Sequence, residues 1–180
     1  MKEVEIKIQI INPEEIIKTL ENNGCVFSEP IVQRDTVYIP NEQLTVPVPP
    51  EVNVLRIRRQ KDKIFLTLKR PDVNNHLSKL EHELEIADAE QMTEIIKLLG
   101  FKVVADTTKT RRKCKINDYE ICVDHVEGLG DFLEMEKITD EDPLVVQNAL
   151  LEFLLKLKID TSQKMDVGYD VLYVRKHGIK

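Results

Sequence analysis

The sequence alternates charged and apolar residues over eight separate runs, and this alternation constrains the fold more than any other feature. Residues two apart in a β-strand share a face, so each run places its charged side chains on one face and its apolar side chains on the other. The pattern predicts half-buried strands and a substantial antiparallel sheet. The predicted strands are 2–11, 34–39, 54–59, 63–69, 79–86, 107–115, 119–126 and 132–138.

Helices are marked by the residues at their ends. Asp88, followed three residues later by Gln91, predicts a capping box, and glycines end the first two helices. The third helix has a broad apolar face and is expected to be well buried. The predicted helices span about 12–24, 88–100 and 139–157.

Length and composition indicate one globular domain, residues 1–180. With 42% hydrophobic and 32% charged residues, the chain is neither disordered nor a membrane protein, and a net charge of -6 argues against general nucleic-acid binding. A signal-peptide pattern is absent, and three cysteines without a CxxC pair fit a reducing compartment, so we expect a cytoplasmic protein.

The first two predicted helices superpose when the sequence is shifted by 76 positions, together with the strands that precede them. This match predicts two repeated halves, about 1–78 and 79–180. Chance is the alternative, because cap and stop residues recur in many α+β proteins.

Charges are sorted by sign along the predicted strands. Carboxylates gather on the terminal strands, whereas long cationic side chains gather on the middle ones. An antiparallel sheet with its charged face in water is the simplest explanation. If the sheet curls so that the charged faces point inward, the cavity needs bound ions, because buried charges require partners. A polyanion would neutralise the cationic side chains, and a divalent metal would neutralise the carboxylates.

Two short turns predict which residues lie opposite each other. A two-residue turn at Lys61-Asp62 would place Arg56 opposite Thr67, and a turn at Asn117-Asp118 would place Arg111 opposite Asp124.

Five short segments occur in the same order as the motifs of a known family. They are Glu3-x-Glu5-x-Lys7, 54–58 (VLRIR), 66–71 (LTLKRP), 109–111 (KTR) and 128–136 (GLGDFLEME). From Glu3 to about Tyr169 the chain resembles the CYTH superfamily, which joins class IV adenylyl cyclases with thiamine triphosphatases and inorganic triphosphatases. The second, third and fifth segments most resemble the class IV cyclases.

The resemblance implies an α+β fold: a closed antiparallel eight-stranded β-barrel, the triphosphate tunnel, with helices packed outside. It also implies roles for individual residues. Glu3, Glu5, Glu134 and Glu136 would hold Mg²⁺ or Mn²⁺, and Glu5, Glu136 and Asp124 would be catalytic. Phosphates would be bound by Lys7, Arg56, Arg58, Lys69, Lys109 and Arg111, while Glu81 and Glu83 would complete the lining of the tunnel.

Three functions follow as alternatives. In an adenylyl cyclase, which we favour, the ribose 3′ hydroxyl of ATP attacks the α-phosphorus and pyrophosphate leaves. In a triphosphatase, water attacks the terminal phosphorus of tripolyphosphate, thiamine triphosphate or a nucleotide. The third alternative is a noncatalytic sensor of polyphosphate or nucleotides. The expected partner is a small triphosphate such as ATP or tripolyphosphate, with no nucleic acid and no membrane, and the chain could form a homodimer.

Overall fold

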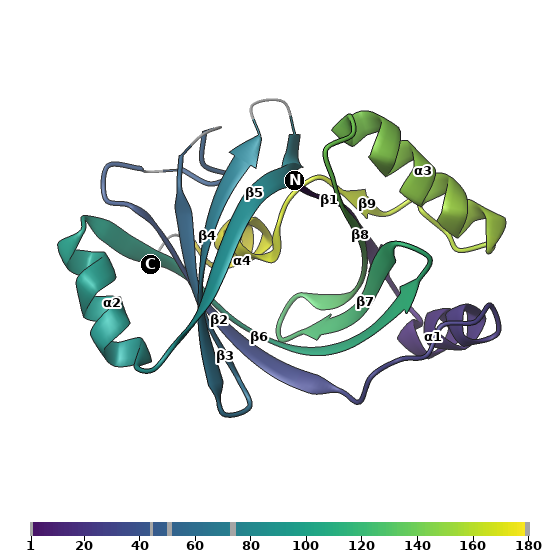
Figure 1. Ribbon diagram of the computed structural model, residues 1–180, viewed down its shortest axis with the longest axis horizontal. Helices are drawn as coiled ribbons and strands as arrows, with labels where there is room; N and C mark the ends of the chain where they lie inside the picture. Colours follow the sequence, from purple (N-terminus) through teal and green to yellow (C-terminus); the bar gives the residue numbers. More distant parts are fainter. Residues whose placement is uncertain (1, 44, 50–51, 73–74, 179–180) are drawn as a thin grey trace. The chain divides into compact units, whose positions relative to one another are not determined.

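The computed structural model describes residues 2–43, 45–49, 52–72 and 75–178, and all eight predicted strands are present in it (Figure 1). Each strand includes most of the predicted run, and several extend further; the largest extension adds residues 101–106 to the sixth strand. The strands are β1 (Lys2–Ile10), β2 (Ile31–Pro40), β3 (Val54–Gln60), β4 (Lys63–Asp72), β5 (Asn75–Ile86), β6 (Phe101–Ile116), β7 (Tyr119–Val126) and β8 (Gly130–Thr139).

The three predicted helices are also present, and two further elements were not predicted. In α2 the carboxylate of Asp88 accepts a hydrogen bond from the backbone N–H of Gln91 at 2.9 Å, which confirms the predicted cap. The predicted helices are α1 (Pro13–Glu21), α2 (Ala89–Leu98) and α3 (Pro143–Lys156); the additional elements are the short strand β9 (Lys164–Met165) and helix α4 (Tyr169–His177).

Both predicted hairpin registers are confirmed. Arg56 lies opposite Thr67 in the β3–β4 pair, and Arg111 lies opposite Asp124 in the β6–β7 pair. The first residue of each turn has positive φ, 51° at Lys61 and 55° at position 117, as hairpin turns that match the strand twist require. A one-residue slip would have reversed the face of every side chain.

The chain divides into two compact units that alternate along the sequence. Unit 1 comprises Met1–Ile31 and Lys109–Asp166, and unit 2 comprises Val32–Thr108 and Val167–Lys180. Strand β6 therefore contributes its first half to unit 2 and its second half to unit 1. The strand order and antiparallel pairings confirm the predicted fold class, an α+β protein built on a closed eight-stranded β-barrel with helices outside.

In unit 1 the strands follow the order β6-β7-β8-β1-β9. Alternate residues of β1, among them Ile6 and Ile8, form one core with α1 and α3. The expectation that α3 is well buried is only partly right. One stripe, including Leu150 and Leu154, is buried, whereas Leu144, Val145 and Leu155 are exposed, because a single helix face packs on the strands.

In unit 2 the strands follow the order β5-β4-β3-β2, with the first half of β6 beside β2. Helix α2 packs on β2 and β3 through Ile96, which clusters with Tyr38 and Ile57. A second cluster joins Val37 and Ile39 with residues of α4.

Two remaining sequence expectations concern membranes and thiols. Within the described part of the chain, none of the helices combines the length and apolar character that a membrane crossing needs. The cysteines at 25, 114 and 122 are all buried free thiols.

Candidate active site

The charged face of unit 1 is built from four strands in fixed register. Antiparallel pairing of β1 with β8 sets Glu5 opposite Glu136 and Lys7 opposite Glu134. Pairing of β7 with β8 sets Asp124 opposite Phe132. The opposite face of β1 packs in the core, which fixes the direction of its charged side chains.

Three carboxylates of unit 1 form a compact acidic group: Glu3, Glu5 and Glu136 each place one oxygen within 4.8 Å of the others. Glu5 is 5% exposed, and buried Gln147 of α3 donates a hydrogen bond to its backbone carbonyl at 2.9 Å, which ties the helix to this strand. Burial, followed by the negative charges of Glu3, Glu5 and Glu134, raises the pKa of Glu136 to about 8.

This acidic group suits a divalent cation. Three carboxylate oxygens from two adjacent strands are the hard ligands that Mg²⁺ and Mn²⁺ prefer. Like charges this close repel one another, and a bound cation or a proton relieves the repulsion. The residues therefore fit the expected metal in chemistry and in spacing.

Glu134, the fourth predicted metal ligand, lies in a different environment. Its carboxylate forms ion pairs with the Nζ of Lys7 and with Nη2 of Arg111. Burial alone would raise its pKa, but the charges of Lys7, Arg111 and Lys109 hold the pKa of Glu134 well below its ordinary value. Glu134 thus neutralises cations, and it is not part of the three-carboxylate group.

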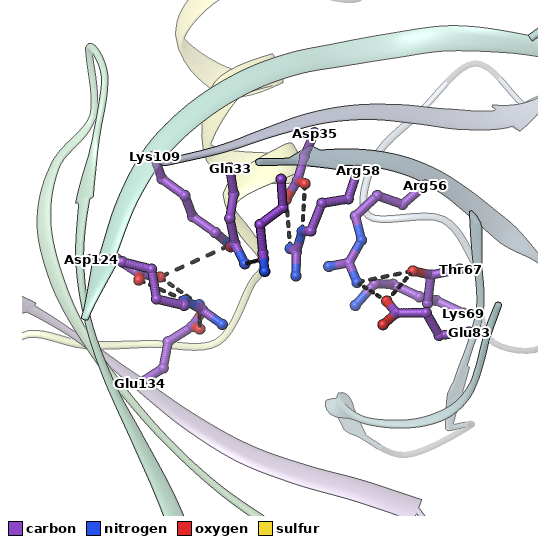
Figure 2. A network of polar contacts seen from close by, with 12 residues as sticks. Gln33, Asp35, Arg56, Arg58, Thr67, Lys69, Glu83, Lys109, Asp124 and Glu134 are labelled. Atoms are coloured by element: carbon purple, nitrogen blue, oxygen red, sulfur yellow. Dashed lines mark hydrogen bonds and ion pairs between the residues drawn. The ribbon is translucent and has the colours of Figure 1, made fainter. Parts of the chain in front are cut away.

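Arg111 is held by Asp124 through two parallel hydrogen bonds. Its Nε donates to Oδ1 at 2.7 Å and its Nη2 to Oδ2 at 2.5 Å. Asp124, which Figure 2 labels, is 0% exposed. Burial opposes the charged guanidinium, but Asp124 and Glu134 raise the pKa of Arg111 well above its ordinary value. Lys109 approaches the same carboxylate, with Nζ 4.0 Å from Oδ2.

Unit 2 holds a second bidentate pair, which the sequence analysis did not predict. Arg58 of β3 donates from Nε to Oδ1 and from Nη2 to Oδ2 of Asp35 on β2, both at 2.7 Å (Figure 2). The two residues lie directly opposite each other in the sheet. Both are buried. A signal was present, since Asp35 lies in the predicted strand 34–39 and shares its face with the apolar Val37, but no short turn fixes which residue of β3 lies opposite it.

Arg56 lies on the same face of β3 as Arg58, two residues earlier. Its Nη2 donates to the hydroxyl of Thr67 at 3.0 Å and to Glu83 at 3.2 Å, while Thr67 donates to Glu83 at 2.7 Å (Figure 2). The side chain of Glu83 is 43% exposed. The three residues join β3, β4 and β5 through one polar contact network.

A carboxylate between two lysines completes the charged face of unit 2. Glu81 accepts from Lys69 at 2.5 Å and lies 3.7 Å from the Nζ of Lys79. Burial would raise its pKa, but Lys69, Lys79 and Arg56 lower the pKa of Glu81 to about 2. Lys79 was not among the predicted bases, although it shares a strand face with Glu81 and Glu83 at two-residue spacing.

The structure therefore divides the predicted site residues between the two units. Each unit combines buried cations with carboxylates on one strand face, and unit 1 alone carries the group of three acids among the residues described. Unit 1 contains Glu3, Glu5, Lys7, Lys109, Arg111, Asp124, Glu134 and Glu136; unit 2 contains Arg56, Arg58, Lys69, Glu81 and Glu83.

Comparison with known proteins gives a family match over nearly the whole chain. The model of the CYTH domain matches residues 1–169. A protein of Methanocaldococcus jannaschii named "Putative adenylate cyclase" is 36% identical over 175 residues, which cover 94% of this chain and 97% of that protein.

Solved structures agree with this match. A protein from Pyrococcus horikoshii OT3 superposes with a TM-score of 0.80 at 28% identity, covering 97% of this chain and 99% of that one. A Hippeastrum protein, described as a putative adenylyl cyclase with a dominant triphosphatase activity, has a TM-score of 0.62 at 17% identity and covers 99% of this chain and 96% of its own. At that identity, the Hippeastrum structure supports the fold alone.

Proposed function

Because the chain belongs to the CYTH domain family, we propose that it is a divalent-metal-dependent enzyme that acts on a small triphosphate, with ATP cyclisation to cyclic AMP and pyrophosphate as its favoured reaction. The observation that carries the proposal is the acidic group Glu3, Glu5 and Glu136 in the same unit as the buried cations Lys7, Lys109 and Arg111. A triphosphate with its metal supplies charges of both signs, which such a face requires.

The acidic group is assigned to the metal, which when bound would neutralise negative charge on the phosphate oxygens. Glu134 and Asp124 are assigned to positioning rather than to proton transfer. Glu134 bridges Lys7 and Arg111, and Asp124 holds Arg111 by two hydrogen bonds. With the cations fixed before the substrate arrives, little side-chain freedom is lost on binding.

The cations are assigned to phosphate binding. Arginine can meet phosphate oxygens with two N–H groups, and lysine acts as a point charge. Catalysis by such a site consists of positioning and of electrostatic relief at phosphorus, so it requires no nucleophilic side chain.

Triphosphate hydrolysis is the second candidate. The Hippeastrum protein, which is described as having a dominant triphosphatase activity, has the same fold, whereas the name of the M. jannaschii relative, at 36% identity, favours cyclisation. Both reactions use the same metal and the same phosphate-binding cations, but a different phosphorus atom is attacked. The cytoplasmic location, a homodimer and the duplication of 1–78 in 79–180 remain predictions.

One product assay decides between these reactions. The protein is incubated with ATP or tripolyphosphate in the presence of Mg²⁺ or Mn²⁺, and cyclic AMP, pyrophosphate, ADP and phosphate are separated by chromatography. Cyclic AMP with equimolar pyrophosphate supports the cyclase, and ADP with phosphate, or cleavage of tripolyphosphate, supports the triphosphatase. Glu85→Gln, which alters an exposed ion pair with Lys63, is the matched control and should retain full activity. No turnover of either substrate with either metal would contradict the proposed function.

A further inference from the structure

The two bidentate arginine–aspartate pairs have the same geometry, but the arginine is on the earlier strand in one pair and on the later strand in the other. In unit 1 the arginine (Arg111) precedes the aspartate (Asp124) along the hairpin, and in unit 2 the aspartate (Asp35) precedes the arginine (Arg58). In both pairs Nε bonds Oδ1 and Nη2 bonds Oδ2, between residues directly opposite each other. The shift of 76 positions that aligns the first two helices also aligns Asp35 with Arg111.

The two guanidinium groups differ in what else they contact. Nη2 of Arg111 is shared with Glu134, so its outer edge already faces a carboxylate. For Arg58, the hydrogen bonds formed within the described ranges all go to Asp35, through the Nε–Nη2 edge. The Nη1–Nη2 edge of Arg58 is therefore available for an anion, and a phosphate group fits that edge with two parallel hydrogen bonds.

We propose that Asp35 is a positioning residue for substrate: it holds Arg58 so that the Nη1–Nη2 edge of the guanidinium binds a phosphate group of the triphosphate. This inference rests on the proposed function. A free arginine side chain samples many rotamers, and a buried bidentate partner removes most of that freedom before the ligand binds. Asp35 is itself buried beside Arg58, so the pair forms a rigid element of β2 and β3.

The sign of the effect separates positioning from a purely structural ion pair. Asp35 carries a negative charge close to the proposed polyanion site. If its charge is all that matters to the ligand, Asp35→Asn reduces repulsion and triphosphate binds more tightly. If Asp35 positions Arg58, the same substitution releases the guanidinium and triphosphate binds more weakly, despite the more favourable charge.

The test measures the dissociation constant of Mg²⁺-tripolyphosphate by calorimetry and the free energy of unfolding in urea. We expect Asp35→Asn to weaken binding about tenfold, equivalent to about 1.4 kcal/mol. The same substitution in an Arg58→Gln background should have no further weakening effect, because the positioned group is already gone. Glu85→Gln removes one carboxylate from an exposed pair and should leave both measurements unchanged.

A reciprocal exchange keeps the proposal testable if Asp35→Asn fails to fold. Asp35→Arg with Arg58→Asp reproduces the strand order that Arg111 and Asp124 use, so it should restore most of the stability of the pair. The guanidinium then extends from β2 instead of β3, and we expect affinity to stay at least tenfold weaker than in the unmodified protein. Recovery of full affinity in this exchange would overturn the proposal.

The remaining outcomes separate failure of the role proposed for Asp35 from failure of the proposed function. Unchanged or tighter binding by a folded Asp35→Asn variant would refute the role of Asp35 and leave the proposed function intact. An equal loss of affinity with and without Arg58 would also refute it. Absence of Mg²⁺-tripolyphosphate and Mg²⁺-ATP binding by the unmodified protein would overturn the proposed function, and the role of Asp35 with it.

Discussion

Glu136 in unit 1 and Glu81 in unit 2 are both partly buried glutamates on the charged face of a strand, yet their pKa values move in opposite directions. Burial raises the pKa of each. Around Glu136 the carboxylates of Glu3 and Glu5 add to that effect and bring the pKa to about 8. Around Glu81 the ammonium groups of Lys69 and Lys79 outweigh it and bring the pKa to about 2.

The two units differ in how their carboxylates are neutralised. In unit 2, Asp35, Glu81 and Glu83 each contact a cation, so the charges there are paired within the protein. In unit 1, Glu134 and Asp124 are paired in the same way, and Glu5 lies 3.5 Å from the Nζ of Lys7, but Glu5 also crowds together with the carboxylates of Glu3 and Glu136. A cation is therefore most strongly favoured at unit 1.

The largest expected effect is on metal-dependent turnover. Glu5→Gln removes one of the three crowded carboxylates and should reduce turnover on the order of 10³-fold, as loss of a key electrostatic group does. Glu81→Gln, in unit 2, should cost less than about tenfold because Glu81 binds cations of the protein. Activity is measured with Mg²⁺ or Mn²⁺ and with EDTA. Turnover that persists in EDTA, or a fully active Glu5→Gln protein, would contradict the assignment of the metal to the carboxylates of unit 1.

The free energy of unfolding should depend more on the buried arginine of unit 1 than on that of unit 2. Arg111→Ala leaves two buried carboxylates, Asp124 and Glu134, without one of their partners and should cost about 3 kcal/mol of unfolding free energy. Arg58→Ala removes a partner from Asp35 alone and should cost less. Urea unfolding of both variants provides the measurement. A larger loss for Arg58→Ala would show that unit 2 depends more on its ion pair than unit 1 does.

Ligand binding should stabilise the folded protein by a smaller amount. A ligand present at a hundredfold excess over its dissociation constant contributes roughly 2.7 kcal/mol, which for a chain of this size is a melting-point rise of roughly 5 to 10 °C. Mg²⁺ alone should give part of this rise through unit 1, and tripolyphosphate should add to it. Sulfate at equal ionic strength serves as the control. If sulfate gives the same shift as Mg²⁺-tripolyphosphate, neither unit has the assigned specificity.

The pH dependence of stability should have opposite signs in the two units. Because Glu136 has a raised pKa, its contribution to stability is full below about pH 4.5 and is lost as the pH rises through about 8. Because Glu81 has a lowered pKa, its contribution is full above about pH 4.5 and is lost as the pH falls through about 2.

Urea unfolding without metal at several pH values tests both statements. Glu136→Gln should flatten the decline between about pH 4.5 and 8, whereas Glu81→Gln should reduce the loss of stability below about pH 4.5. Saturating Mg²⁺ should abolish the decline in the unmodified protein, because metal replaces the proton on Glu136. If the free energy of unfolding still declines between about pH 4.5 and 8 with Mg²⁺ and in the Glu136→Gln variant, Glu136 is not the source of the decline.

Much of the fold follows from local pattern. Alternation at period two located all eight long strands, and two-residue turns fixed the partners of Arg56 and Arg111 correctly. These features are local: a few residues determine them. Helix α4 was missed because its charged residues at 170, 175 and 176 dilute the apolar periodicity, and β9 is only two residues long.

The site was less predictable because its details depend on which strands become neighbours. The pattern of alternating charge placed Glu134 and Glu136 on one face, but only the contacts of Lys7 and Arg111 separate their roles. The pairing of Asp35 with Arg58 likewise needs the β2–β3 register, and the β2–β3 connection, residues 41–53, is too long to fix that register by turn geometry.

The interleaving of the two units has a consequence for the order in which the chain folds. Strands β2 to β5 follow one another in sequence, so these four strands of unit 2 can pair through contacts close in sequence, whereas β1 must wait for β8, with Lys7 and Glu134 separated by 127 residues. Non-local pairing is slow because a long loop must close first. During synthesis, the acidic residues of β1 therefore leave the ribosome long before their partners. We expect hydrogen exchange, measured by pulse labelling during refolding, to protect β3 and β4 before β1, so that the residues proposed to bind metal come together last.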